Sequence, residues 1–151
     1  MAVRDRIGAF LAAHNTLTLA TVGADGQAHA CAVFYAAGPD LALYFLSEPK
    51  SLHARHIGEG PLMIAATIED NNQDWTSIRG LQIHGLARPC TGEDVDNART
   101  LYAARYPFVG RVQTLAGPLG RARFYQIMPS WFRLIDNTLG FGHKEELNIE
   151  R

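Results

Sequence analysis

The sequence lacks most of the motifs that assign a chain to a well-known enzyme class. It contains no GxSxG nucleophile motif, no P-loop and no GxGxxG stretch. Acyl transfer and Rossmann-type nucleotide binding therefore have no motif support. Cysteine is scarce as well: Cys31 and Cys90 are the only two, and they form no CxxC pair. We expect both to be buried free thiols in apolar, strand-like surroundings.

The sequence also lacks excess charge and long apolar runs. Lys and Arg number 14 against 15 Asp and Glu, so charge favours neither nucleic acid nor an anionic membrane as a partner. No apolar run approaches the roughly 20 residues that cross a bilayer, and no signal-peptide pattern follows the charged start. We expect a cytoplasmic protein. The length of 151 residues predicts one domain over residues 1–151.

What the sequence does contain is a series of short β-rich segments separated by turns. Residues 17–22 and 28–36 flank Asp25-Gly26, which is typical of a β-hairpin turn. The other predicted strands are 41–46, 62–68, 78–89, 123–128 and 131–135, the last two broken at Pro129-Ser130. Short connections favour antiparallel neighbours, and glycines inside the long strand favour the bends that close a sheet. The pattern predicts a mainly β fold: a six- to seven-stranded antiparallel barrel with flanking helices.

Helical spacing of apolar residues occurs in a few places. It predicts an amphipathic helix over 3–14, a short one over 52–57, and a longer one from Thr91 to Tyr106 that Pro107 ends. Residues 108–119 are ambiguous, with spacing that suggests another short helical piece. The C-terminal segment 138–151 is predicted to be a mobile tail, either a ligand-facing loop or a frayed terminus.

The stretch 41–67 holds the clearest candidate for a binding site. A strand ends at Ser47, a polar turn follows, and Ser51 stands at the N-cap of the short helix. A helix N-terminus offers backbone N–H groups to an anion, and His53 and Arg55 lie within the same turns. This pattern predicts a bound phosphate group. An ordinary connecting helix with a solvated basic face is the alternative.

The order of elements resembles the pyridoxamine 5′-phosphate oxidase-like split barrels that bind FMN. The most telling segment is Tyr44-Phe45-Leu46-Ser47, followed by Ser51-Leu52-His53-Ala54-Arg55-His56-Ile57. In that family a strand ends in Ser or Thr, and a step near the next helix holds the FMN phosphate. Trp75 ahead of residues 78–85 resembles the family's entry to the fifth strand. Residues 135–146 resemble one uncharacterised bacterial branch.

The resemblance implies a homodimer with two flavin sites at its interface and a small-molecule substrate. The cofactor contacts that it implies are Leu46, Ser47, Ser51 and His53 near the phosphate, Ala32, Val33 and Phe34 along the ring, and Trp75 and Gln82 from the neighbouring subunit. The residues themselves leave a plainer interpretation open, since strand residues are usually core and a lone Trp usually caps a barrel.

Two departures from the family pattern bear on the reaction. His53 stands where tight FMN binders usually carry Lys, and a histidine is charged only part of the time near neutral pH. The phosphate clamp is therefore expected to be weaker or pH-sensitive. The C-terminal Arg-x-x-Trp signature of true pyridoxamine phosphate oxidases is absent from the sequence, which argues against vitamin B6 oxidation.

Three functions remain open from the sequence. The first is an FMN-dependent oxidoreductase that receives electrons from NAD(P)H or a small organic molecule, with no catalytic residue assigned. The second is a barrel that holds flavin or haem without turnover, with His143 as an axial ligand. The third is a dimeric module without a cofactor. A metal site on His53, His56 and His84 is not predicted, because no carboxylate or cysteine completes a recognised ligand spacing.

Overall fold

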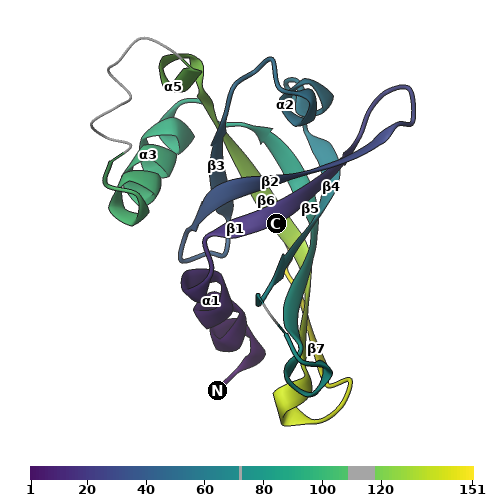
Figure 1. The fold of residues 1–151 in the computed structure, drawn as a ribbon. Helices are drawn as coiled ribbons and strands as arrows, with labels where there is room; N and C mark the ends of the chain where they lie inside the picture. The colour runs from purple at the N-terminus through teal and green to yellow at the C-terminus, as the bar shows by residue number, and fades with distance from the viewer. Residues whose placement is uncertain (72, 109–117) are drawn as a thin grey trace.

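The protein is described by a computed structural model that covers residues 1–71, 73–108 and 118–151 and is built around one antiparallel sheet (Figure 1). The strands are β1 (Thr16–Val22), β2 (Ala28–Ala37), β3 (Leu43–Ser47), β4 (Leu62–Glu69), β5 (Arg79–Pro89), β6 (Arg123–Asp136) and β7 (Lys144–Asn148). They lie in the order β3-β2-β1-β4-β5-β6-β7, and β3 also pairs with β6. The first six strands therefore close into a barrel, and β7 extends the sheet beyond it. The predicted mainly β barrel is confirmed.

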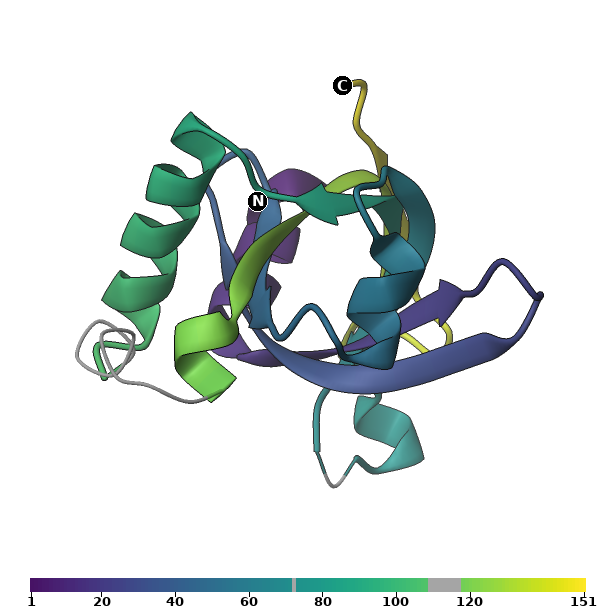
Figure 2. The ribbon, with the colours of Figure 1, turned by 90° about the horizontal axis from the view of Figure 1, so that it is seen from above.

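The helices flank the barrel as Figures 1 and 2 show. They are α1 (Val3–Ala13), α2 (Leu52–Ile57), α3 (Glu93–Arg105) and α5 (Pro118–Arg121), with 3₁₀ turns η1 (Trp75–Ser77) and η2 (Asn137–Leu139). α2 lies at the rim of the barrel, and α3 lies outside it. The helical piece predicted at 108–119 falls mostly on residues 109–117, outside the described part of the chain. No helix among the described residues is long and apolar enough to cross a membrane.

β6 corrects one prediction, because the expected break at Pro129-Ser130 does not occur. The strand runs unbroken for 14 residues, and its pairing with β5 shifts register between His84 and Gly85. Gly85 faces Pro129 across this irregularity, and a β-bulge is a place where a strand tolerates proline. A Cβ on Gly85 would lie 2.5 Å from the Met128 carbonyl oxygen. The glycine therefore allows the close approach that keeps β6 continuous.

The two halves of β6 have different partners. Residues Arg123 to Ile127 pair with β3 and close the barrel, whereas Trp131 to Ile135 pair with β7. The segment predicted as a tail thus contains a strand. The guanidinium of Arg6 in α1 donates to the Glu145 carboxylate of β7, with Nε 2.7 Å from Oε2. The last strand is therefore attached to the first helix.

Alternation along the strands separates an inner from an outer face, as expected for a half-buried sheet. On β2, Val33 and Tyr35 point into the barrel and are buried, whereas Ala32 and Phe34 point outward and are exposed. The largest fully buried side chains of the barrel include Tyr35, Phe45, Leu19, Leu43, Tyr125 and Phe132. A second apolar cluster, which includes Tyr44, Ala98, Tyr102 and Phe124, packs α3 against the outside of β3 and β6.

Candidate functional site

The structure brings together three of the residues predicted near a phosphate. Ser47, at the end of β3, shares a hydrogen bond with His53 of α2, with Oγ 2.7 Å from Nε2. Ser51 Oγ lies 3.4 Å from the same nitrogen. Ser47 is buried, and the other two side chains are half-buried. The turn between β3 and α2 therefore holds the His53 ring at the rim of the barrel.

Ser51 has a different local role from the one predicted. It occupies the N-cap position of α2, but its side chain makes no cap hydrogen bond. Its hydroxyl donates instead to the Glu48 carbonyl oxygen at 2.7 Å, while its own carbonyl accepts from the Arg55 amide. Ser51 thus closes the turn ahead of the helix.

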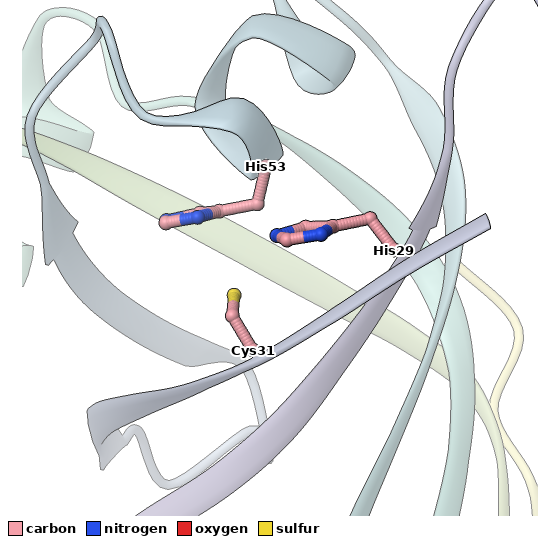
Figure 3. A group of neighbouring side chains, drawn as sticks. All are labelled: His29, Cys31 and His53. Atoms are coloured by element: carbon pink, nitrogen blue, oxygen red, sulfur yellow. The ribbon is translucent and has the colours of Figure 1, made fainter. Parts of the chain in front are cut away.

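Sequence reasoning missed the other half of this cluster, His29 and Cys31 on β2. One ligand atom from each of His29, Cys31 and His53 lies within 4.8 Å of the other two, and Figure 3 shows the three side chains converging. His29 and Cys31 are two positions apart on one strand, so both point to the inner face. That i, i+2 spacing was a signal available in the sequence. We call His29, Cys31, Ser47 and His53 the rim cluster.

Another contact between a strand and a helix supports α2 beside the rim cluster. The Thr21 hydroxyl of β1 lies 2.8 Å from His56 Nδ1, and the His56 and His29 rings meet edge to face with centroids 6.1 Å apart. Thr21 is 1% exposed. Since a buried hydroxyl needs a partner, this hydrogen bond fixes how α2 sits over β1.

Burial controls the protonation of the rim cluster. Desolvation lowers the pKa of His53 from its ordinary 6.5, and the neighbouring imidazoles of His29 and His56 lower that pKa further. Desolvation raises the pKa of the Cys31 thiol. Both shifts favour the uncharged forms, an imidazole at His53 and a thiol at Cys31. In these forms the two side chains bind through hydrogen bonds or lone pairs rather than through a fixed positive charge.

The outer face of the barrel beside the rim cluster is apolar and hollow. Ala30, Ala20 and Ala65 are cross-strand neighbours on β2, β1 and β4, and His84 on β5 is next in that row. Larger side chains surround this alanine floor. The cavity over it has a volume of about 520 Å³ and is lined by Ala20, Thr21, Val22, Ala28, His29, Ala30, Met63, Ile64, Ala65 and His84. His29 lines the cavity and is also a member of the rim cluster, so the cavity borders the rim cluster.

The remaining predicted contacts are scattered. Ala32 and Gln82 lie outward in one row across β2, β1, β4 and β5, one row from the alanine floor. Phe34 is outward and 55% exposed, whereas Val33 is core. Leu46 packs at the edge of the second apolar cluster.

Trp75 lies away from the other predicted contacts within this chain. It follows the end of β4 that is remote from α2, and its ring meets Phe141 edge to face at 5.9 Å. A contact between Trp75 and the rim cluster would therefore require a second chain, as the family resemblance implies.

The histidines considered as a metal set do not converge. His84 lies on the outside of the barrel, with its ring 4.5 Å from that of Trp131, and His56 bonds Thr21. His143 lies before β7, with Nε2 3.4 Å from Glu145. Cys90 is buried as predicted, but Cys31 is only half-buried.

Comparison with known proteins places this architecture. A family model described as pyridoxamine 5′-phosphate oxidase matches residues 3–135. A UPF0306 protein, YhbP, of Salmonella schwarzengrund is 34% identical over 139 residues, which are 91% of this chain and 88% of that protein. Among solved structures, a conserved hypothetical protein of Mycobacterium tuberculosis has a TM-score of 0.75 at 22% identity, with 100% of this chain and 94% of that one covered.

A second similar structure belongs to a protein described as binding heme. A heme-binding protein of Mycobacterium smegmatis matches 98% of this chain with a TM-score of 0.77 at 16% identity. The chain spans 59% of that protein's length. At such identities the likeness concerns the fold.

Proposed function

The chain belongs to the pyridoxamine 5′-phosphate oxidase family, and from this premise we propose that it is a homodimeric cofactor-binding protein that holds FMN and acts as a flavin-dependent oxidoreductase on a small molecule. The observation that carries the proposal is the cavity of about 520 Å³ beside the rim cluster. Its alanine floor suits a flat ring, because small side chains leave an apolar surface open to stacking.

The residues present fit the two ends of FMN unequally. The alanine floor is apolar, as an isoalloxazine ring requires. The adjoining rim cluster offers the hydroxyls of Ser47 and Ser51 and the imidazole of His53 as phosphate donors. Because burial lowers the pKa of His53 and favours its neutral form, it would bind phosphate through an N–H group, and a phosphate would be held less tightly than by Lys. Bound FMN would supply the redox chemistry, and the protein would bind and orient it.

The outer face also supports dimer formation. Val22, Met63 and Leu86 are each more than 40% exposed around the alanine floor on β1, β4 and β5, and Phe34 is exposed farther along β2. A contiguous apolar patch such as Val22, Met63 and Leu86 form with the floor usually marks an interface. We therefore propose that a second copy covers this face and encloses the ring. The same pairing would bring the partner's Gln82 and Trp75 toward the cofactor, as the family resemblance implies.

The experiment compares FMN with riboflavin, which carries the same ring without the phosphate. Each is added to the purified protein, which is then desalted, and its visible spectrum is recorded. We expect FMN to be retained. His53→Ala should weaken FMN binding by about 10-fold or more, on the scale of one charge-assisted hydrogen bond, and leave riboflavin affinity unchanged. His53→Lys should tighten the binding of FMN and leave the binding of riboflavin unchanged.

A control and two contrary outcomes make the test decisive. Arg99→Ala removes a charge on exposed α3, far from the rim cluster, and should change neither affinity. Equal FMN affinity in wild type and His53→Ala would remove the phosphate from this site. A protein that retains no flavin would overturn the FMN proposal. Steady-state assays with NAD(P)H and dye acceptors then test turnover.

Haem is the second candidate, favoured by one observation. His84 lines the same cavity with its ring against Trp131, and an imidazole there is a suitable axial ligand. The likeness to the heme-binding protein supports the idea at the level of fold. A Soret band that His84→Ala removes, and His143→Ala does not, would favour haem over FMN.

A further inference from the structure

The rim cluster contains the donor atoms of a metal site. His29, Cys31 and His53 offer two imidazole nitrogens and one sulfur, all within 4.8 Å of one another. Around a tetrahedral zinc ion, bond lengths of about 2.0–2.1 Å to nitrogen and 2.3 Å to sulfur put ligand atoms about 3.4–3.6 Å apart. The three atoms therefore need to approach one another by no more than about 1.4 Å.

From this geometry we propose that His29, Cys31 and His53 bind a zinc ion, with the fourth coordination position open. The set contains nitrogen and sulfur donors, and among the described residues no carboxylate joins the group. Imidazole and thiolate suit zinc, whereas magnesium and calcium require oxygen ligands. Three protein ligands with one open position are the arrangement of zinc sites that bind a water molecule or a substrate.

Two elements hold these ligands in place before any ion arrives. The extended β2 backbone puts His29 and Cys31 on the same face. Ser47 Oγ hydrogen-bonds the His53 ring at 2.7 Å, and such a bond to a ligating histidine fixes both its orientation and its tautomer. Ser47 thus acts as a positioning residue. The rigid strand and the oriented ring limit the reorganisation that binding requires.

The protonation of the rim cluster is compatible with metal binding. A ligating histidine must be neutral and a ligating cysteine must be a thiolate. The Cys31 thiol gives up its proton to solvent when the ion binds, because a coordinated thiol is deprotonated outright. One ion therefore releases one proton, and the site gains one net positive charge.

All three ligands are half-buried, so the group can be reached from solvent. The gained positive charge would stand next to Ser47 and Ser51, at the place where Lys is usual in tight FMN binders. The proposal does not depend on flavin binding, since zinc affinity is measured with no flavin present.

The test uses the full chain, treated with a chelator and then supplied with zinc or cobalt. We expect one zinc ion per chain after dialysis, measured by inductively coupled plasma mass spectrometry. Cobalt in the same site should give an intense thiolate-to-metal charge-transfer band in the near ultraviolet. Removal of outer hydrogen bonds to ligands costs about 10–100-fold in metal affinity. Cys31→Ser removes a ligand outright, so it should weaken zinc binding by more than about 100-fold and abolish the band.

Matched variants separate this site from chance binding. Cys90→Ala removes the other thiol, which is buried in the second apolar cluster, and should leave zinc affinity and the cobalt band unchanged. Ser47→Ala should weaken zinc binding by about 10-fold and retain the band. Circular dichroism of the metal-free variants checks that each is folded.

One further measurement uses the wild-type chain and needs no variant. Zinc should protect Cys31 from alkylation, read by peptide mass spectrometry, with Cys90 as the internal reference. Zinc binding that survives Cys31→Ser, or zinc that leaves Cys31 equally reactive, would overturn the proposal. A protein that retains no zinc would overturn it too.

Discussion

The inner and outer faces of β2 differ more than those of an ordinary half-buried strand. The inner face carries His29 and Cys31 at the rim and then Val33 and Tyr35 in the core. The outer face carries Ala28, Ala30, Ala32 and Phe34, all exposed, and then Ala36, which is buried in the second apolar cluster. The usual arrangement has apolar residues inside and polar residues outside. Here the first half of the strand reverses that arrangement.

This reversal marks positions whose side chains do not help to stabilise a single chain. Polar side chains at the inner rim must find partners, and α2 supplies them. Apolar side chains outside leave surface that folding of one chain does not bury. Real proteins violate such patterns mainly at functional sites. The two faces therefore serve different parts of the proposals: the inner rim the phosphate and the metal ion, the outer floor a ring and a second subunit.

The largest expected effect lies in the core half of the inner face. Tyr35→Ala removes a fully buried ring whose hydroxyl donates to the Leu11 carbonyl at 2.7 Å. We expect a loss of about 3–5 kcal/mol in the free energy of unfolding, measured by urea denaturation. Phe34→Ala, the next residue on the outer face, should cost less than about 1 kcal/mol. Equal losses would mean that one chain packs both faces.

The outer face is tested next by its ability to hold a second chain. Ala30→Arg puts a charge in the centre of the alanine floor, where dimer formation would strip it of water without a partner. We expect the dimer dissociation constant to rise at least 100-fold, which corresponds to about 2.7 kcal/mol. Analytical ultracentrifugation measures it. Ala104→Arg on the exposed side of α3 is the control, and a dimer that withstands Ala30→Arg uses another surface.

A smaller effect on stability is expected when threonines on the two faces of β1 are replaced. Thr21→Val removes the inner hydroxyl that bonds His56 Nδ1 at 2.8 Å, and we expect a loss of about 1 kcal/mol in unfolding free energy. Thr18→Val, three positions earlier on the outer face, should change it by less than about 0.5 kcal/mol. Thermal denaturation of both variants side by side measures the difference. A larger loss at Thr18 would reverse the assignment of the faces.

The smallest expected effect is a pH dependence of stability that arises at the inner rim. The pKa of His53 is lowered by burial and then by His29 and His56. Below its ordinary pKa of 6.5 the unfolded chain therefore binds a proton that the folded chain does not. Stability of the metal-free protein should fall as pH drops below about 6.5 and level off below the lowered pKa. Solvent around this half-exposed group keeps the effect small.

Urea midpoints at several pH values, with a chelator present, measure this dependence. His53→Gln removes the titrating group and should flatten its part of the curve. The imidazoles of His29 and His56 contribute to the lowered pKa of His53, so each is also replaced singly. A curve that keeps its slope in His53→Gln would show that His53 is not the source of the pH dependence.

The fold was predictable because each element has a strong local signal. Alternation gave the strands, Asp25-Gly26 gave the first hairpin, and helical spacing gave α1 and α3 to within a residue or two. The continuity of β6 was not predictable in the same way. Pro129 is tolerated only because Gly85 on another strand leaves room at a bulge, and that compensation is tertiary. β7 was not predicted, because its sequence is charged and it pairs with β6 at an exposed edge.

The candidate site was predictable in its local part only. Ser47, Ser51 and His53 lie within seven residues of one another, so one turn and one helix bring them together. His29 and Cys31 precede His53 by more than 20 residues, and only closure of the barrel puts them beside it. Their shared face was visible in the sequence, but their partner was not. The contacts predicted for Trp75 and Gln82 stay predictions, since they involve a second chain.

The way β6 closes the barrel sets the order in which the molecule can be assembled. Leu43 of β3 pairs with Ile127 of β6, 84 positions later, whereas β1 and β2 meet through a turn of a few residues. Contacts between distant residues form slowly, because a long loop must close before they contribute. During synthesis β3, which pairs with β2 soon after it is made, therefore has an open edge. Only the arrival of β6 covers that edge and completes the barrel wall that carries Ser47 of the rim cluster.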